Sequence, residues 1–213
     1  MLLNLARKKK VLLFGGSFDP IHNGHIAVAR YAIEHIGADE LVFIPAHRSP
    51  HKQLLPGAIA SERLHMIELA IAGEQRMRVS DCEVKREPPS YTIDTVRYFR
   101  GQYGDDTEFY WLVGADMLND LPRWYRIREL LDECTICLML RPEFETPKLD
   151  RFMDIFGHEQ VGKLEQNIIL NPLVDISSTE IRRRVAAGED ISHMVHPVVA
   201  IYIKEHSLYR GAF

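Results

Sequence analysis

A glycine-rich stretch directly after an apolar run constrains the fold of this chain more than any other feature. The run 11–14 is typical of a short buried strand, and it passes through Gly15 and Gly16 into a segment that ends at His25. From Ile26 onward, apolar residues recur at helical spacing. A strand that ends in glycines and leads into a helix points backbone N–H groups and the positive end of the helix dipole at an anion. The stretch therefore predicts a phosphate site in an α/β fold.

Two histidines distinguish this site from the common phosphate-binding motifs. His22 and His25 are three residues apart, so both can face an anion from the first helical turn. The stretch is neither a Gly-x-Gly-x-x-Gly fingerprint nor a P-loop, because no Gly-Lys-Ser/Thr follows. The same spacing also suits zinc, with Asp19 as the candidate third ligand.

Apolar runs and helical periods alternate along the rest of the chain. Strand-like runs occupy residues 41–44, 77–80, 109–113, 135–140 and 168–170. Caps support the helices between them, with Gly37 ending the first, Ser61 starting the second and Gly73 ending it. This alternation predicts a doubly wound, mostly parallel sheet of the Rossmann-like α/β class. In such a sheet, ligands bind outside the carboxyl ends of the strands.

Length and composition favour one domain. The chain has 213 residues, 46% of them hydrophobic, which suffices for one ample core. We expect a basic tail at residues 1–10 and a single domain at residues 11–213. The net charge of −4 argues against a general nucleic-acid binder. Because no apolar run reaches membrane-spanning length and no signal peptide is evident, we expect a cytoplasmic protein without a membrane partner.

The three cysteines are predicted to be core residues. Their odd number does not suit a disulfide framework. Cys134 and Cys137 have the spacing of redox and zinc motifs, but they lie in a strand-like run, where positions three apart face opposite sides of the sheet.

A second candidate anion site begins at Ser177. The run Ser177-Ser-Thr-Glu180 has the pattern of a capping box, in which each end residue bonds the other's backbone N–H. Such a helix start leaves the N–H groups of Ser178 and Thr179 for an anion. Three arginines at 182–184 follow, although the helix dipole disfavours cations there, and a bound anion would offset that conflict. We interpret the second and third of them as surface residues.

Asp116 and the adjacent pair Trp124 and Tyr125 have two interpretations each. Asp116 is either a ribose ligand just past a strand end or the N-cap of the next helix, and the two roles are compatible. Trp124 and Tyr125 are adjacent aromatics on a loop, so both cannot pack on one helix face. One could anchor the core, but for the pair we favour a stacking surface for a flat ring.

These motifs carry a resemblance to a known family. Residues 15–20 with His22-Asn-Gly-His25, and residues 176–182, resemble the two signatures of the nucleotidyltransferase superfamily. Between them, residues 50–52, 89–92, 114–116 and 122–125 resemble bacterial nicotinate-nucleotide adenylyltransferases. The chain departs from that pattern at Ser17, where the family usually has threonine, and at Ser49, where a second proline is common.

The resemblance implies that ATP and nicotinate mononucleotide react to give nicotinate adenine dinucleotide and pyrophosphate, in NAD biosynthesis. Mg²⁺ would be carried by ATP. The implied catalytic residues are His22, His25, Lys52 and Arg182. The implied ATP-binding residues are Gly15, Gly16, Ser17, Phe18, His25, Asp116, Ile176, Ser177, Ser178, Thr179 and Arg182. The implied acceptor-binding residues are Ser17, His51, Lys52, Thr92, Trp124 and Tyr125.

Other functions stay open at this point. The acceptor could be nicotinamide mononucleotide or phosphopantetheine, although phosphopantetheine adenylyltransferases are usually shorter and lack the Trp-Tyr pair. A regulator that binds nucleotide without catalysis is the alternative from another class. Such a protein could lose its histidines or Arg182, and here all of them are present.

Overall fold

A parallel sheet forms the centre of the molecule. The computed structural model describes residues 7–47, 57–140, 146–170 and 175–211. Six strands in these residues pair in the order β3-β2-β1-β4-β5-β6, and every pairing is parallel. The strands are β1 (Lys9–Gly16), β2 (Glu40–Pro45), β3 (Met77–Val79), β4 (Thr107–Gly114), β5 (Thr135–Leu140) and β6 (Ile168–Leu170). The sequence order therefore reverses between β1 and β4, as the doubly wound prediction requires.

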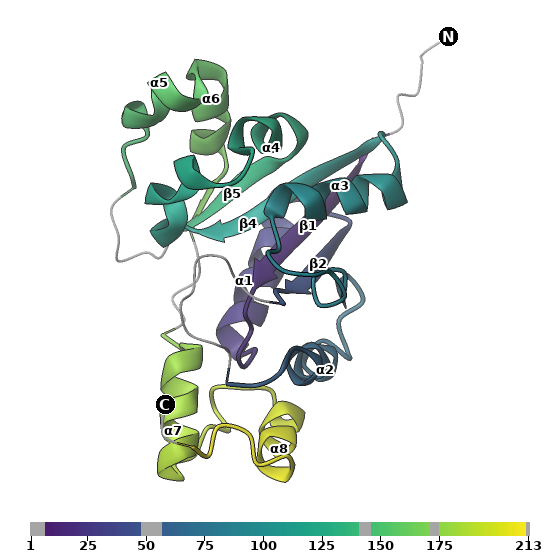
Figure 1. The fold of residues 1–213 in the computed structure, drawn as a ribbon, viewed down its shortest axis with the longest axis vertical. Coiled ribbons are helices and arrows are strands. Elements are labelled where there is room, and N and C mark those ends of the chain that lie inside the picture. Colours follow the sequence, from purple (N-terminus) through teal and green to yellow (C-terminus); the bar gives the residue numbers. More distant parts are fainter. Residues whose placement is uncertain (1–6, 48–56, 141–145, 171–174, 212–213) are drawn as a thin grey trace.

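Helices cover both faces of this sheet (Figure 1). The longer ones are α1 (Asn23–Ile36), α2 (Ala60–Ala70), α3 (Thr92–Tyr103), α4 (Ile127–Glu133), α6 (His158–Gln166), α7 (Ser178–Ala187) and α8 (Pro197–Glu205). Short elements are α5 (Met153–Phe156) and the 3₁₀ turns η1 (Ala115–Asn119), η2 (Leu121–Arg123) and η3 (Asp150–Phe152). Within the described residues, no helix is long and apolar enough to cross a membrane.

Alternation along β1 divides the core into two layers. Leu12 packs in the layer shared with α1, α2, α7 and α8, whereas Val11 and Leu13 pack in the layer shared with α3, α4, α5 and α6. All three side chains are fully buried. Since successive strand residues face opposite sides, a continuous apolar run is what a sheet covered on both faces needs. Cys137 and Cys134 lie on opposite sides of this core, and burial raises the pKa of the Cys137 thiol to about 12.

The structure corrects several expected element boundaries. Lys9 and Lys10, assigned to the basic tail, are the first residues of β1. Ser61 is not a cap, because α2 has Ile59 as its N-cap and the Glu62 carboxylate accepts the Ile59 N–H at 2.9 Å. That helix ends before Gly73. Helix α6 was not predicted, since only two of its residues, Val161 and Leu164, are buried.

Candidate active site

A cavity of about 550 Å³ opens at the carboxyl ends of β1 and β4. These are the two strands between which the sequence order reverses, the place where sheets of this type bind ligands. The cavity is lined by the segment that leaves β1, the start of α3, the end of β4 and the loop before α4. Of the predicted site residues, those on its surface are Gly15, Gly16, Ser17, Thr92, Asp116, Trp124 and Tyr125.

The two glycines at the end of β1 are needed for packing as well as for access. A Cβ on Gly15 would collide with the Trp111 indole, and one on Gly16 would lie 2.8 Å from the Phe18 ring. Phe18 has a φ of 46°, a left-handed conformation that is uncommon for a residue with a side chain. Its buried ring packs edge-on against Phe14 and Phe43. The glycines therefore let the rings of Trp111 and Phe18 lie directly against the segment that leaves β1.

The two histidines lie together at the start of α1. His22 is the N-cap and His25 is the third residue of the helix. Their rings stack with centroids 3.6 Å apart, and the backbone N–H of His22 donates to His25 Nδ1 at 3.3 Å. When His25 is neutral, this bond leaves its proton on Nε2, so that Nε2 is the donor. Both rings thus lie at the positive end of a helix dipole with no acidic residue in its first turn.

The described residues give no support to a zinc site. No group of three or more His, Cys, Asp or Glu side chains within them could hold a metal ion. Asp19, the expected third ligand, is buried and accepts hydrogen bonds from the Gly57 N–H at 2.7 Å and the Tyr209 hydroxyl at 2.8 Å. Its carboxylate is thus engaged in hydrogen bonds to other segments of the chain.

The second signature docks onto the first, although 158 positions separate the bonded residues. The Ser178 hydroxyl donates to the Pro20 carbonyl at 2.9 Å, and Arg182 Nη1 donates to the Asp19 carbonyl at 2.7 Å. Helix α7 therefore begins beside the loop that leads into α1. Ser177 caps α7 by accepting the Glu180 N–H at 3.2 Å, as predicted. This geometry places the N-terminal turns of two helices and one arginine around the same loop.

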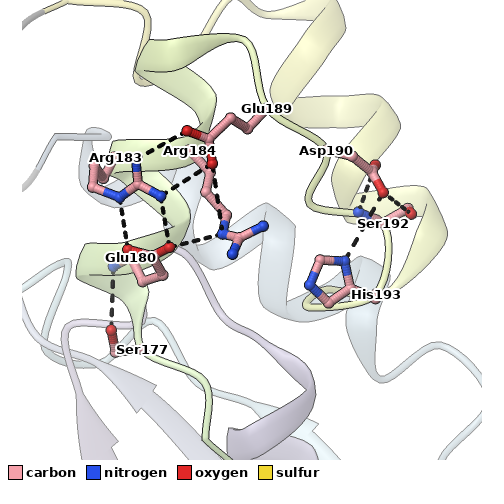
Figure 2. A network of polar contacts seen from close by, with 8 residues as sticks. All are labelled: Ser177, Glu180, Arg183, Arg184, Glu189, Asp190, Ser192 and His193. Carbon is pink, nitrogen blue, oxygen red and sulfur yellow. Dashed lines mark hydrogen bonds and ion pairs between the residues drawn. The ribbon is translucent and has the colours of Figure 1, made fainter.

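The other half of the predicted capping box is wrong. In the described contacts, the Glu180 carboxylate does not return to the Ser177 N–H but bonds Arg183 and Arg184 (Figure 2). Arg183 also pairs with Glu189, at 3.0 Å, beyond the end of the helix. Two guanidinium groups one turn away offer the carboxylate charge-assisted bonds, which are stronger than one to a neutral N–H. Arg183 and Arg184 thus form ion pairs on the helix surface, whereas Arg182 contacts the first signature.

The far end of the cavity is aromatic. Tyr125 is 51% exposed and stacks on Tyr91 with ring centroids 4.4 Å apart. Trp124 is half-buried and packs on the core layer beneath α3 and α4. Trp124 is therefore the residue of the pair that anchors in the core, and it also lines the cavity. Tyr125 forms an exposed part of the cavity wall. Thr92 is the first residue of α3, so its N–H is one of the N-terminal donors that have no partner within the helix.

The remaining predicted residues fall into three groups. Asp116 lines the cavity within η1, whose N-cap is Gly114, so the predicted capping role is wrong and the ribose role stays a prediction. Ile176 and Thr179 lie at the start of α7, outside the cavity's lining. His51 and Lys52 fall outside the described residues.

Sequence reasoning missed a buried acid on the cavity's surface. Glu83 is 5% exposed and accepts a 2.7 Å hydrogen bond from the Thr95 hydroxyl, which itself accepts one from Arg86 at 3.2 Å. Burial raises the pKa of the Glu83 carboxyl, opposed by the hydroxyls of Thr95 and Ser90 and by the charge of Arg86. Glu83 follows a three-residue strand and shows no periodicity, so no sequence pattern identified it.

This buried acid leads to a stability prediction. A carboxyl whose pKa is raised by folding contributes stability below its unfolded pKa, near 4.5, and loses that contribution as the pH rises through the folded pKa. Glu83→Gln keeps an acceptor for Thr95 and removes the charge. We expect its melting temperature to match that of the unmutated protein at pH 4 and to exceed it by about 2–4 °C at pH 8, for about 1 kcal/mol. Thermal melts across this range, with the exposed Glu87→Gln as control, check it. An equal difference at every pH would contradict it.

Comparison with known proteins shows the family of this chain. A family model described as cytidylyltransferase-like matches residues 13–184, which places the chain among the nucleotidyltransferases. A probable nicotinate-nucleotide adenylyltransferase of Neisseria meningitidis serogroup B is 41% identical over 94% of this chain and 98% of its own length. A probable nicotinate-nucleotide adenylyltransferase of Bacillus pumilus is 38% identical over 95% of this chain and 100% of its own. The chain belongs to the nicotinate-nucleotide adenylyltransferase family.

A solved structure confirms the fold. Nicotinic acid mononucleotide adenylyltransferase of Plasmodium falciparum, complexed with NaAD, superposes with a TM-score of 0.74. The match covers 94% of this chain and 97% of that one, at 21% identity. The Rossmann-like nucleotidyltransferase architecture predicted from the alternation of strands and helices is therefore confirmed.

Proposed function

We propose that this protein transfers the AMP moiety of ATP to nicotinate mononucleotide, giving nicotinate adenine dinucleotide and pyrophosphate in NAD biosynthesis. The observation that carries the proposal is the docking of the starts of two helices, α1 and α7, beside an aromatic cavity at the end of β1. The paired helix starts suit a triphosphate, and the aromatic cavity suits a flat ring. The names of the relatives fit the same reaction.

The acceptor would occupy the cavity. Its pyridine ring would lie against Trp124, while Tyr125 is already stacked on Tyr91. The carboxylate of the ring would accept from backbone N–H groups at Thr92 and Tyr125, with the dipole of α3 favouring an anion at Thr92. The phosphate of the acceptor, ionised at neutral pH, would then be directed toward Ser17 and the α-phosphorus of ATP.

The chemical step would depend on positioning and charge. The acceptor phosphate oxygen forms a bond to the α-phosphorus while the bond to the bridging oxygen of pyrophosphate breaks, in line. His22 and His25 would donate to the α-phosphate oxygens as negative charge grows. Arg182 would bind the leaving β- and γ-phosphates, and Lys52 is proposed for the same task from the sequence alone. In this scheme the acceptor phosphate is the nucleophile, and no side chain of the protein acts as one.

Mg²⁺ is proposed as a companion of ATP. Magnesium in nucleotide-dependent sites is often bound mainly by substrate phosphates and water, with few protein ligands. When bound, it would neutralise charge on the triphosphate. We also propose that the protein works in the cytoplasm.

An assay of pyrophosphate release separates this function from its alternatives. We expect nicotinate mononucleotide to be preferred over nicotinamide mononucleotide by at least about tenfold in kcat/KM, because the amide would direct an NH₂ group at backbone donors. Steady-state kinetics with both mononucleotides and with phosphopantetheine check this. Equal efficiency for the two mononucleotides would refute acid recognition, and no release with any acceptor would favour a non-catalytic nucleotide binder.

Trp124→Ala tests the stacking role separately. Because a ring face contacts either pyridine equally, we expect the variant to raise the KM of both mononucleotides by similar factors, roughly tenfold for 1–2 kcal/mol of stacking. The preference for the acid should persist. A variant that loses the preference but retains affinity would show that Trp124 reads the ring substituent. Trp111 is no suitable control, since it packs against Gly15.

A further inference from the structure

The start of α3 lines the cavity and depends on tertiary contacts for its position. Tyr91, the N-cap, and Thr92, the first helical residue, both contribute to the cavity surface. Within the described residues, the side chain of Tyr91 makes no capping hydrogen bond. The Tyr91 ring also stacks on Tyr125. The two proposed donors to the acceptor carboxylate, the N–H groups of Thr92 and Tyr125, therefore both adjoin this turn.

The buried carboxyl of Glu83 contacts the next turn of the same helix. It accepts the 2.7 Å hydrogen bond of the Thr95 hydroxyl, and Thr95 is fully buried. Arg86 donates to the same hydroxyl oxygen at 3.2 Å. Glu83 thus ties α3 to the segment that follows β3, one helical turn away from the residues that line the cavity.

The Thr95 hydroxyl has a second acceptor within reach. Its oxygen lies 3.5 Å from the carbonyl oxygen of Tyr91. That carbonyl already accepts the backbone N–H groups of Asp94 at 3.1 Å and Thr95 at 3.3 Å. A threonine inside a helix can bond the carbonyl four residues before it, and such bonds often bend helices. Because a hydroxyl has one proton, the 2.7 Å bond to Glu83 keeps that proton from the Tyr91 carbonyl.

We propose that Glu83 is a positioning residue for the acceptor site, because its carboxyl draws the Thr95 hydroxyl away from the Tyr91 carbonyl and so fixes the first turn of α3. This inference rests on the proposed function, in which the Thr92 N–H binds the carboxylate of nicotinate mononucleotide. Since the effect of Glu83 is transmitted through α3, it should concern the acceptor and not ATP, whose proposed ligands lie outside that helix.

Glu83→Met tests the inference, since methionine has a similar length and offers no oxygen to Thr95. We expect the KM for nicotinate mononucleotide to rise about fivefold, equal to about 1 kcal/mol and typical of one hydrogen bond, while the KM for ATP stays within about twofold. Glu83→Gln keeps an oxygen for the Thr95 hydroxyl and should restore the KM for the mononucleotide. Glu87→Met, at an exposed glutamate of the same connecting segment, is the matched control and should change neither constant.

A shorter acid separates position from charge. Glu83→Asp keeps the charge but withdraws the carboxyl by one methylene group, so it should raise the KM for nicotinate mononucleotide as Glu83→Met does. Normal constants in folded Glu83→Asp and Glu83→Met proteins would overturn the proposal. Impairment of Glu83→Gln with normal Glu83→Asp would also overturn it, because the charge would then be responsible. In a double-mutant cycle, Glu83→Met should add almost nothing to the effect of Thr95→Val, and additive effects would contradict the inference.

Amide hydrogen exchange provides a readout that needs no substrate. Because the N–H groups of Asp94 and Thr95 bond the Tyr91 carbonyl, we expect their exchange to be about fivefold faster in Glu83→Met than in the unmutated protein. Equal exchange rates would overturn the inference whatever the protein catalyses. Faster exchange in a protein that releases no pyrophosphate with any acceptor would refute the proposed function, whereas it would support the link from Glu83 to the start of α3.

Discussion

Replacing either histidine of the first signature is expected to lower turnover about 100- to 1,000-fold while changing ATP affinity little, because each imidazole is proposed to bind charge that grows only in the transition state. His22→Ala removes one ring of the stacked pair. His25→Ala removes the other ring and also the acceptor of the His22 backbone N–H. Single-turnover kinetics with saturating ATP measure the effect on the chemical step directly.

A conservative variant separates catalysis from helix capping. In His25→Asn, the side-chain oxygen can still accept the His22 N–H, but the Nε2–H donor is lost. We therefore expect a normal melting temperature with turnover as low as in His25→Ala. His35→Ala, in the last turn of the same helix, is the control and should be fully active. Near-normal turnover in a folded His25→Asn protein would refute the role assigned to Nε2.

Arg182→Ala is expected to lower kcat/KM for ATP about a hundredfold, corresponding to about 3 kcal/mol for a partly desolvated charge contact. Both KM and turnover should change, because the guanidinium is proposed to bind phosphates that become the leaving group. Arg182→Lys should recover only part of this loss, since a lysine cannot bond the Asp19 carbonyl and a phosphate through one planar fork. Steady-state kinetics with ATP as the varied substrate test both expectations.

The two neighbouring arginines are controls of the same residue type on the same helix. Arg183 and Arg184 are paired with Glu180 at the surface, where such ion pairs contribute little to stability (Figure 2). Their alanine variants should therefore leave the KM for ATP within about twofold, an effect below 0.5 kcal/mol. If all three variants lost activity equally, the basic run would act as a diffuse positive surface, and the specific contact would be wrong.

The sequence predicted the strands and the two signatures well because their causes are local. A run such as Leu41–Ile44 needs no partner to be recognised as buried, and Gly37 ends α1 in the left-handed conformation that favours glycine, with a φ of 66°. Prediction failed where distant or competing contacts decide. Ser61 is not the N-cap of α2, because the helix begins earlier, where the Glu62 carboxylate accepts the Ile59 N–H. The Glu180 carboxylate turned to arginines rather than to its own helix start.

The same distinction applies to the candidate site. Residues on the signature loops could be predicted from sequence, because phosphate binding depends on the local backbone and on helix starts, and their roles stay predictions. Tyr91, Glu83 and Trp111 were missed because they reach the cavity from three separate segments, and only the tertiary packing brings them there. Arg63 was missed for a related reason, since a fully buried arginine on an otherwise ordinary helix contradicts the usual surface preference of that residue.

The docking of Ser178 on Pro20 has a consequence for the order in which the protein is made. Every described residue that lines the cavity lies between Phe14 and Tyr125, so this part of its lining is synthesised well before α7. The proposed ATP site cannot be complete at that stage, because Ser178, Arg182 and Tyr209, which bond Pro20 and Asp19, come from the last quarter of the chain. Under the proposed function, competence for adenylyl transfer would therefore arise only at the end of synthesis.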